Sequence, residues 1–381
     1  MYNFDEVIDR RHMRSAKWSI PEDWLSMGVA DMDFRSPYEI QAALLQDLAI
    51  GNYGYKNGTW EAFRDAAIDW EKRRHGIELK PEWMSFAPGV IAGMAQAFYT
   101  LTKPGDKVVI LTPVYGPFFM LASMDGREKV ECPLLNDEQG WHVDFDLLEK
   151  KCTGAKVLFL CSPHNPVGRV WTREELKTMC GICRRTGCLL FADEIHHDLI
   201  LDGRQFVTAA DADPDFAEQI VSAGAPSKTF NIPGFGASYV VARNPEHHQA
   251  ISRISGLLHI NGNMYAHMAG EAAYRHGDQW LDECLAYIQG NRDFASGWLQ
   301  ENLPDFPFSD LQGTYLLWLD CRPAGVSGKE ILEALNKHGV NPTQGEFFGA
   351  PEFMRLNIST TRSQLEEALS RVKAGILEVR K

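Results

Sequence analysis

The chain has 381 residues, of which 45% are hydrophobic and 23% charged, so it is an ordinary globular protein with enough apolar material for a sizeable core. Its formal net charge of −13 argues against nucleic acid or an anionic membrane as the main partner. No apolar run approaches the length of a membrane span, and residues 1–14 lack the apolar core of a secretory signal, so we expect a cytoplasmic protein.

The middle of the chain alternates short apolar runs with helical patterns, which is typical of an α/β fold with strands buried in a parallel sheet. One helix is predicted to open near Gly89. Another is predicted to open at Thr172, where Thr172 and Glu175 form a capping box. The expected strands are the runs 107–111, 156–161, 188–192, 220–223 and 237–242.

The last third changes to long helical patterns around the run 313–320, which indicates a smaller α+β unit. No break in composition marks a boundary. We expect residues 46–275 to form a large domain and residues 276–381 a small C-terminal domain. Residues 1–45 are aromatic-rich and irregular and are expected to pack on the small domain.

Eight cysteines are scattered through the chain, and Cys180 and Cys183 form a C-x-x-C pair. A metal or redox site is one interpretation, but no second ligand pair follows at zinc spacing. The favoured interpretation is a helix face that leads into a buried strand, with thiols kept reduced.

Two residues that follow predicted strands suit pyridoxal 5′-phosphate (PLP), which needs a lysine for its aldehyde and an acid at its pyridine nitrogen. Lys228 comes after the run 220–223, where a side chain points into the ligand crevice of an α/β sheet. Asp193 directly follows the run 188–192, and a carboxylate there would keep the ring nitrogen protonated. A surface lysine and a helix N-cap are the alternatives.

PLP also needs a donor near its O3′ atom, and two residues can supply one. His196 lies three residues after Asp193, and Asn165 follows the run 156–161. A simple Asn-Pro turn and metal binding by His196 and His197 are the alternatives. Adjacent histidines do not share a helix face, so we expect no metal there.

The ring face, the phosphate and the substrate carboxylate each have a candidate as well. Tyr115 offers an aromatic surface, although core packing explains it equally. The segment 89–91, with Gly89, Val90 and Ile91, opens a helix whose N–H groups suit an anion. Arg355 lies in a strand-like run and suits bidentate binding of a carboxylate, with a surface salt bridge as the alternative.

The order and spacing of these residues resemble the fold-type I PLP enzymes of the aspartate aminotransferase (class I/II) superfamily. In detail the chain looks like the MalY/PatB-type cystathionine β-lyases, which are cysteine C–S lyases. The similarity spans nearly the whole chain. It is carried by the strings VADMDF (29–34), YGY (53–55), PVYGPF (113–118), SPHNPVGR (162–169), DEIH (193–196), SKTFNIP (227–233), GTYLLWLD (313–320) and RLN (355–357).

The resemblance implies a fold and a role for each candidate. The fold is a large PLP-binding domain with a mostly parallel seven-stranded sheet, plus a small α+β domain. Lys228 would hold PLP as a Schiff base and move the Cα proton, and Asp193 would pair with the pyridine nitrogen. The remaining roles are O3′ contacts for Asn165 and His196, ring stacking for Tyr115, phosphate contacts for Val90, Ile91 and nearby Ser227, and carboxylate binding for Arg355 with backbone near Ala30.

The resemblance also implies an assembly and a reaction. Tyr55 would reach the phosphate from the other subunit of a homodimer. The reaction would be β-elimination from cystathionine or an S-substituted L-cysteine through an external aldimine and a Cα carbanion, giving pyruvate, ammonia and a thiol. An aminotransferase of an L-amino acid shares every step up to the carbanion, and a PLP-binding regulatory protein is a further alternative. No Gly-x-Gly-x-x-Gly supports a nicotinamide dehydrogenase.

The chain departs from the family pattern at four places. Gly28 stands where many relatives have Trp, and it would leave space near the substrate mouth. Gly236 and Ala225 stand where aminotransferases often have a basic residue and a serine, so the phosphate grip is expected to depend on backbone groups and Tyr55. The segment 359–362 (STTR) replaces the more usual Ala-Cys-Pro-Arg.

Overall fold

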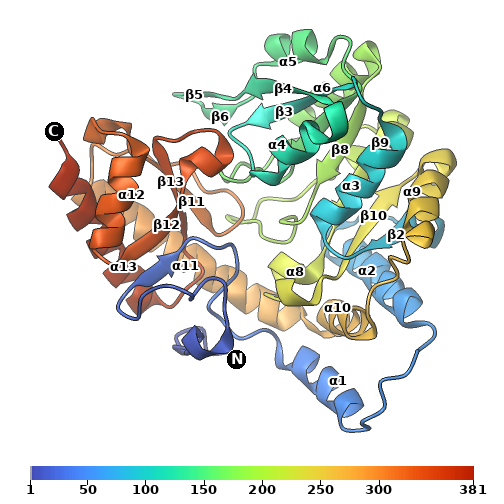
Figure 1. Ribbon diagram of the computed structural model, residues 1–381, viewed down its shortest axis with the longest axis horizontal. Coiled ribbons are helices and arrows are strands. Elements are labelled where there is room, and N and C mark those ends of the chain that lie inside the picture. The colour runs from blue at the N-terminus through green and yellow to red at the C-terminus, as the bar shows by residue number, and fades with distance from the viewer. Residues whose placement is uncertain (1) are drawn as a thin grey trace.

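The computed structural model describes residues 2–381 and contains two large sheets, which lie side by side in Figure 1. Seven strands form the larger sheet in the order β2-β10-β9-β8-β7-β3-β4. This α/β architecture with a mostly parallel seven-stranded sheet confirms the predicted fold class. The strands are β2 (Met84–Ala87), β3 (Lys107–Thr112), β4 (Glu128–Pro133), β7 (Val157–Cys161), β8 (Leu189–Asp193), β9 (Ile220–Gly224) and β10 (Ser238–Ala242).

The expected strand 237–242 is present, but its predicted parallel direction is wrong. Strand β10 runs antiparallel to both of its neighbours, β2 and β9. The connection from β9 to β10 explains this direction. Residues of this connection, 225–237, line a cavity at the carboxyl edge of the sheet, so the chain does not cross to the opposite edge before β10 begins. A chain that stays at that edge must return in the opposite direction, whereas a parallel strand needs a crossover.

Helices cover both faces of this sheet because successive strand residues point to opposite sides. Val108 belongs to the same hydrophobic core as helix α3 (Val90–Leu101), and Val109 belongs to the same core as helix α6 (Arg173–Thr186). The other helices associated with this sheet are α1 (Tyr38–Leu48), α2 (Thr59–His75), α4 (Pro117–Ala122), α5 (Phe145–Cys152), α7 (Ala209–Ala212), α8 (Pro226–Thr229), α9 (Pro245–Leu257) and α10 (Met264–His276).

The smaller sheet combines the two ends of the chain. Strand β1 (Leu25–Met27) pairs in parallel with β12 (Val340–Gln344), followed by β13 (Phe353–Asn357) and β11 (Leu316–Asp320). Figure 1 shows the dark blue N-terminal segment against the red C-terminal part. The exact boundaries at 45 and 275 stay a prediction. Helices α11 (Asp278–Asn302), α12 (Gly328–Lys337) and α13 (Arg362–Val379) accompany this sheet, and β5 (Leu135–Asp137) and β6 (Gly140–His142) form a separate hairpin.

The cysteines lie in the hydrophobic interior and form no disulfide within residues 2–381. Cys180 and Cys183 lie on α6 and belong to one of the two cores of the larger sheet. Burial raises the pKa of the Cys180 thiol to about 12, so the group stays protonated at neutral pH. In the described part of the chain, no helix is long and apolar enough to cross a membrane.

The predicted capping box at the start of α6 is present. Thr172 Oγ1 accepts a hydrogen bond from Glu175 N, and Glu175 Oε2 accepts one from Thr172 N. We expect Thr172→Ala to lower the free energy of unfolding by about 1 kcal/mol, because the N–H group of Glu175 loses its acceptor in the first turn of the helix. Urea unfolding of the holoprotein measures the change.

A suitable control is Thr178→Ala in the same helix, since Thr178 is exposed and donates only to Glu174 O. It is expected to change the stability by less than about 0.5 kcal/mol. Equal effects of the two substitutions would contradict a specific capping contribution.

Candidate active site

Most of the predicted site residues gather at the carboxyl edge of the larger sheet, because Gly89, Tyr115, Asn165, Asp193 and Lys228 lie at or just after the ends of strands that point to this edge. A cavity of about 330 Å³ opens there. Arg355 and Tyr55 are the two predicted residues that do not line it. Those that do are Ala30, Gly89, Val90, Ile91, Tyr115, Asn165, Asp193, His196, Ser227 and Lys228.

Lys228 lies on the short helix α8, which begins directly after β9. Its Nζ atom donates a hydrogen bond of 2.6 Å to Ala30 O, which also accepts one of 3.1 Å from Tyr315 Oη. Burial and then the positive charge of Arg355 lower the pKa of Lys228 to about 8. A neutral amine, which is the nucleophilic form, is therefore available near physiological pH.

Asp193 is the last residue of β8, and its carboxylate accepts a hydrogen bond of 3.1 Å from Ile195 N. Residues 195–198 form a turn, so Asp193 caps no helix. Burial raises the pKa of this carboxyl to about 6. The carboxylate is still ionised at neutral pH, and a cationic partner at the cavity would stabilise it further.

His196 is buried at the wall of the same cavity, and its Nδ1 atom has no hydrogen-bond partner within residues 2–381. Burial, followed by the charges of Lys228 and Arg355, lowers the pKa of His196 well below the usual value. The imidazole is therefore neutral. A buried polar atom without a partner in a cavity wall is suited to a polar ligand.

Asn165 and Arg355 form one unit, because Arg355 Nη1 donates to Asn165 Oδ1 at 3.3 Å. The amide NH₂ of Asn165 is left as a donor. The second terminal nitrogen of Arg355, Nη2, donates to Gly28 O at 2.8 Å, and the guanidinium stacks over the Phe348 ring. Burial lowers the pKa of Arg355 to about 10, so it keeps its charge.

The start of α3 forms one wall of the cavity. Gly89 N donates to Ser238 Oγ, while Val90 and Ile91 occupy the first turn, where N–H groups have no partner within the helix. Ser227 and the ring of Tyr115 line the same cavity. Free N–H groups, a hydroxyl and the positive end of the helix dipole together suit a phosphate.

The backbone conformation and a close neighbour explain why position 236 is a glycine. Its φ is +65°, and a Cβ atom there would lie 3.1 Å from Pro88 O. Any larger residue would be strained and would press on the wall that contains Gly89. The basic residue that aminotransferases often have here would therefore adopt a strained backbone conformation in this chain.

Tyr55 is fully exposed in the single chain and lies in a separate surface pocket with Tyr53 and His259. None of residues 53–55 of the same chain lines the cofactor cavity. The predicted role of Tyr55 across a subunit interface stays a prediction.

Sequence reasoning missed several residues of the site. Cys161, Ile195 and Pro233 line the cavity, and Tyr315 contacts Ala30. Cys161 could have been found, since it ends the buried run before Asn165. Tyr315 lies in the string 313–320, which marked the family resemblance but suggested no role.

A buried network behind the cavity was also missed. Asp198 Oδ2 accepts a hydrogen bond of 2.7 Å from Thr229 Oγ1, and Asp198 Oδ1 accepts one of 2.9 Å from Trp70 Nε1. Thr229 follows Lys228 directly. The network therefore joins the loop after β8 to the helix that carries the lysine.

These residues fit PLP. The cavity holds a lysine amine, a buried carboxylate, a neutral histidine with an unpaired ring nitrogen, an amide donor and free N–H groups at a helix start. Each matches one functional group of the cofactor, namely the aldehyde, the pyridine nitrogen, O3′ and the phosphate. A carboxylate-binding arginine lies next to the amide.

Comparisons with known proteins agree with this chemistry. The sequence pattern of the family described as aminotransferase class I and II matches residues 22–372. Cystathionine β-lyase PatB of Bacillus subtilis (strain 168) is 37% identical, over 98% of this chain and 100% of PatB.

Two solved structures are similar throughout. Cystalysin from Treponema denticola, which contains a PLP cofactor, has a TM-score of 0.94 and 32% identity, covering 99% of both chains. The PLP-bound C–S lyase from Staphylococcus hominis has a TM-score of 0.92 and 30% identity, covering 99% of this chain and 98% of that one.

The lowered pKa of Lys228 predicts how fast the cofactor-free protein reacts with PLP. Because the pKa lies near 8 and not at 10.5, the neutral amine appears as the pH rises through about 8. The rate of PLP capture, followed by stopped-flow absorbance, should therefore rise with pH and level off above that value. Arg355→Gln should move the midpoint to higher pH, because it removes a positive neighbour.

Arg322→Gln, at an exposed arginine, is the control and should leave the midpoint in place. A midpoint near 10.5 in the unmodified protein would show that Lys228 is not perturbed.

Proposed function

The chain belongs to the aminotransferase class I and II family, in its cystathionine β-lyase branch, and from this premise we propose that it is a PLP-dependent C–S β-lyase. The substrate is cystathionine or another S-substituted L-cysteine, and the products are pyruvate, ammonia and a thiol. The observation that supports this most directly is that Lys228, Asp193 and Asn165 line one cavity, with Arg355 hydrogen-bonded to Asn165.

We propose that Arg355 and Asn165 position the amino acid. Arg355 is buried and keeps its charge, so its two terminal nitrogens can hold the α-carboxylate in a bidentate pair. The substrate carboxylate would replace Gly28 O at Nη2, because a carboxylate is a stronger acceptor than a carbonyl. This contact fixes the orientation of Cα toward Lys228.

Five residues would bind the cofactor without taking part in proton transfer. The carboxylate of Asp193 keeps the pyridine nitrogen protonated, while neutral His196 and the Asn165 amide donate toward O3′. The N–H groups of Val90 and Ile91 receive the phosphate. When bound, the cofactor supplies a ring that accepts the electrons released at Cα.

Lys228 Nζ is the general base in this proposal. Its amine is neutral near pH 8 and takes the proton from the substrate Cα atom. The electron pair of that C–H bond then forms the Cα–Cβ double bond as the thiolate leaves from Cβ. Lys228 returns a proton to the sulfur, and water hydrolyses the remaining enamine to pyruvate and ammonia, so that one water is consumed for each substrate.

An aminotransferase of an L-amino acid is the second candidate, and the family description itself favours it. The two reactions need the same lysine, acid and arginine, and differ in whether a group leaves from Cβ. A purely regulatory PLP-binding protein is less well supported, because binding a partner requires neither a lysine with a lowered pKa nor a buried arginine.

The decisive experiment uses the purified holoenzyme with L-cystathionine or S-alkyl-L-cysteines and no keto acid. We expect sustained release of pyruvate and thiol in equal amounts. Lys228→Ala should lower kcat by about a hundredfold or more, because the general base is lost. Lys329→Ala, at an exposed lysine, is the control and should have no effect.

Turnover that appears only when a keto acid is added would contradict the lyase and establish the aminotransferase. Elimination that persists in Lys228→Ala would contradict the assigned base.

The assembly and the compartment complete the proposal. We propose a homodimer in which Tyr55 of each subunit contacts the phosphate at the partner's site, supported by its full exposure and its absence from its own cavity. We propose a cytoplasmic location, supported by buried cysteines that form no disulfide in residues 2–381.

Hybrid dimers test the role of Tyr55. Tyr55→Phe should weaken PLP binding about tenfold or more, since it removes one hydrogen bond to a charged group. Mixing Tyr55→Phe subunits with Lys228→Ala subunits creates hybrids in which one site combines an intact Lys228 with an intact Tyr55. That site should bind PLP with the affinity of the unmodified enzyme.

The matched control is Tyr53→Phe in the same exposed loop, which should keep the original affinity. Hybrids that bind PLP no better than Tyr55→Phe homodimers would place Tyr55 at the site of its own subunit.

A further inference from the structure

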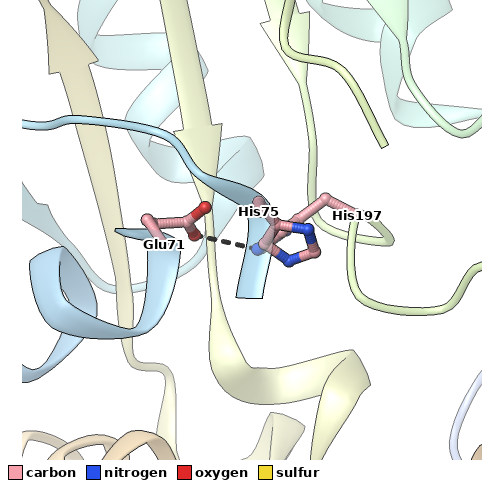
Figure 2. Close-up of side chains that lie close together, drawn as sticks. All are labelled: Glu71, His75 and His197. Atoms are coloured by element: carbon pink, nitrogen blue, oxygen red, sulfur yellow. Dashed lines mark ion pairs between the residues drawn. The ribbon is translucent and has the colours of Figure 1, made fainter. Parts of the chain in front are cut away.

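We propose that Glu71, His75 and His197 form a binding site for one divalent transition-metal ion of the Zn²⁺ type. The three side chains converge behind the active-site cavity, with candidate ligand atoms that all lie within 4.8 Å of one another. Figure 2 shows the ion pair between the carboxylate of Glu71 and the imidazole of His197, with His75 beside them. Two imidazoles and a carboxylate are a common ligand set for Zn²⁺.

The sequence spacing brings the first two ligands together. Glu71 and His75 are four residues apart on α2, so they lie on the same face of this helix, one turn apart. His197 approaches from the turn that follows β8. Sequence reasoning considered His197 only together with His196, whose side chain belongs to the cofactor cavity instead.

The ring of His197 is oriented as a metal ligand. Its Nδ1 atom donates a hydrogen bond of 2.6 Å to Glu194 O, which fixes a proton on Nδ1 and leaves Nε2 for an ion. Nε2 lies 2.9 Å from Glu71 Oε1, yet this buried atom has no hydrogen bond of good geometry within residues 2–381. A buried ring nitrogen of this kind is an available ligand atom.

A second carboxylate, that of Asp198, lies close to two of these ligands. Asp198 Oδ1 lies 2.7 Å from His75 Nε2, and Asp198 Oδ2 lies 3.5 Å from His197 Nε2. Zinc bonds of about 2.0–2.2 Å place two tetrahedral ligand atoms about 3.3 Å apart. The ligand atoms of Glu71, His75 and His197, which all lie within 4.8 Å of one another, therefore need to approach by up to about 1.5 Å to surround one ion.

The charges favour a divalent cation. Glu71 and Asp198 are both buried carboxylates, and buried charges need compensation. The nearest groups that could carry positive charge are imidazoles, since Glu71 Oε1 lies 2.9 Å from His197 Nε2 and Asp198 Oδ1 lies 2.7 Å from His75 Nε2. One divalent ion supplies two positive charges and balances both carboxylates while both imidazoles are neutral.

The site has space and a route from solvent. Glu71 and His197 line a small cavity of about 30 Å³, which is enough to hold a water molecule. His75 is 10% exposed and lines a surface cleft of about 430 Å³. An ion can therefore reach the ligands from the His75 side.

Equilibrium dialysis of the purified holoenzyme against micromolar Zn²⁺, followed by metal analysis, tests the proposal. We expect one Zn²⁺ per chain. His75→Gln should weaken binding at least about tenfold, because it removes one ligand at the edge of the site, and Glu71→Gln should do the same. Retained cofactor absorbance and circular dichroism report that each variant is folded.

The matched control is His338→Gln, since His338 and Glu378 form an exposed imidazole–carboxylate pair at 2.7 Å without a third ligand. This variant should bind Zn²⁺ as the unmodified enzyme does. No stoichiometric Zn²⁺ in the unmodified enzyme would overturn the proposal, as would equal retention by folded His75→Gln. Metal content is measured without substrate, so neither result depends on the proposed lyase activity.

Discussion

The geometry of the active site depends on the hydrogen bonds that the buried carboxylate of Asp198 accepts. Asp198 ends the turn that begins after Asp193, and it accepts hydrogen bonds from Trp70 on α2 and from Thr229 on α8. Thr229 follows Lys228, so one carboxylate ties the loop that carries the acid to the helix that carries the lysine. Charged hydrogen bonds that are buried are costly to break, and this keeps the two reactive groups at a fixed separation.

The two sides of this turn differ in their charged groups: cations surround His196, and carboxylates surround His197. On the cavity side, burial keeps His196 neutral while Lys228 and Arg355 can both carry positive charge. On the other side, Glu71 and Asp198 hold positive charge on His197. The two adjacent histidines differ in this way because His196 lines the cofactor cavity, whereas His197 lies beside Glu71 and Asp198. The cavity is thus suited to anionic groups, as a phosphate and an α-carboxylate both require.

Local patterns predicted the part of the site that lies at strand ends. Asp193 and Lys228 were found because each follows a buried apolar run, and the carboxyl ends of parallel strands meet at one edge. Contacts between distant segments left no such pattern. The pairing of His197 with Glu71 and the contact of Tyr315 with Ala30 depend on how helices and sheets pack. The reversed direction of β10 likewise depends on the course of its connection and not on its own residues.

The N-terminal segment is part of the active site in this fold. Parallel pairing of β1 with β12 places Gly28 O against Arg355 and, two residues later, Ala30 O against Lys228. Arg355 is buried and Lys228 half-buried, and each donates one hydrogen bond to a neutral carbonyl that does not cancel its charge. An anionic substrate is then bound more strongly than the carbonyl that it displaces, because its hydrogen bonds to a cation are charge-assisted on both sides. The same contact that satisfies Arg355 in the free protein therefore leaves its charge available for the substrate.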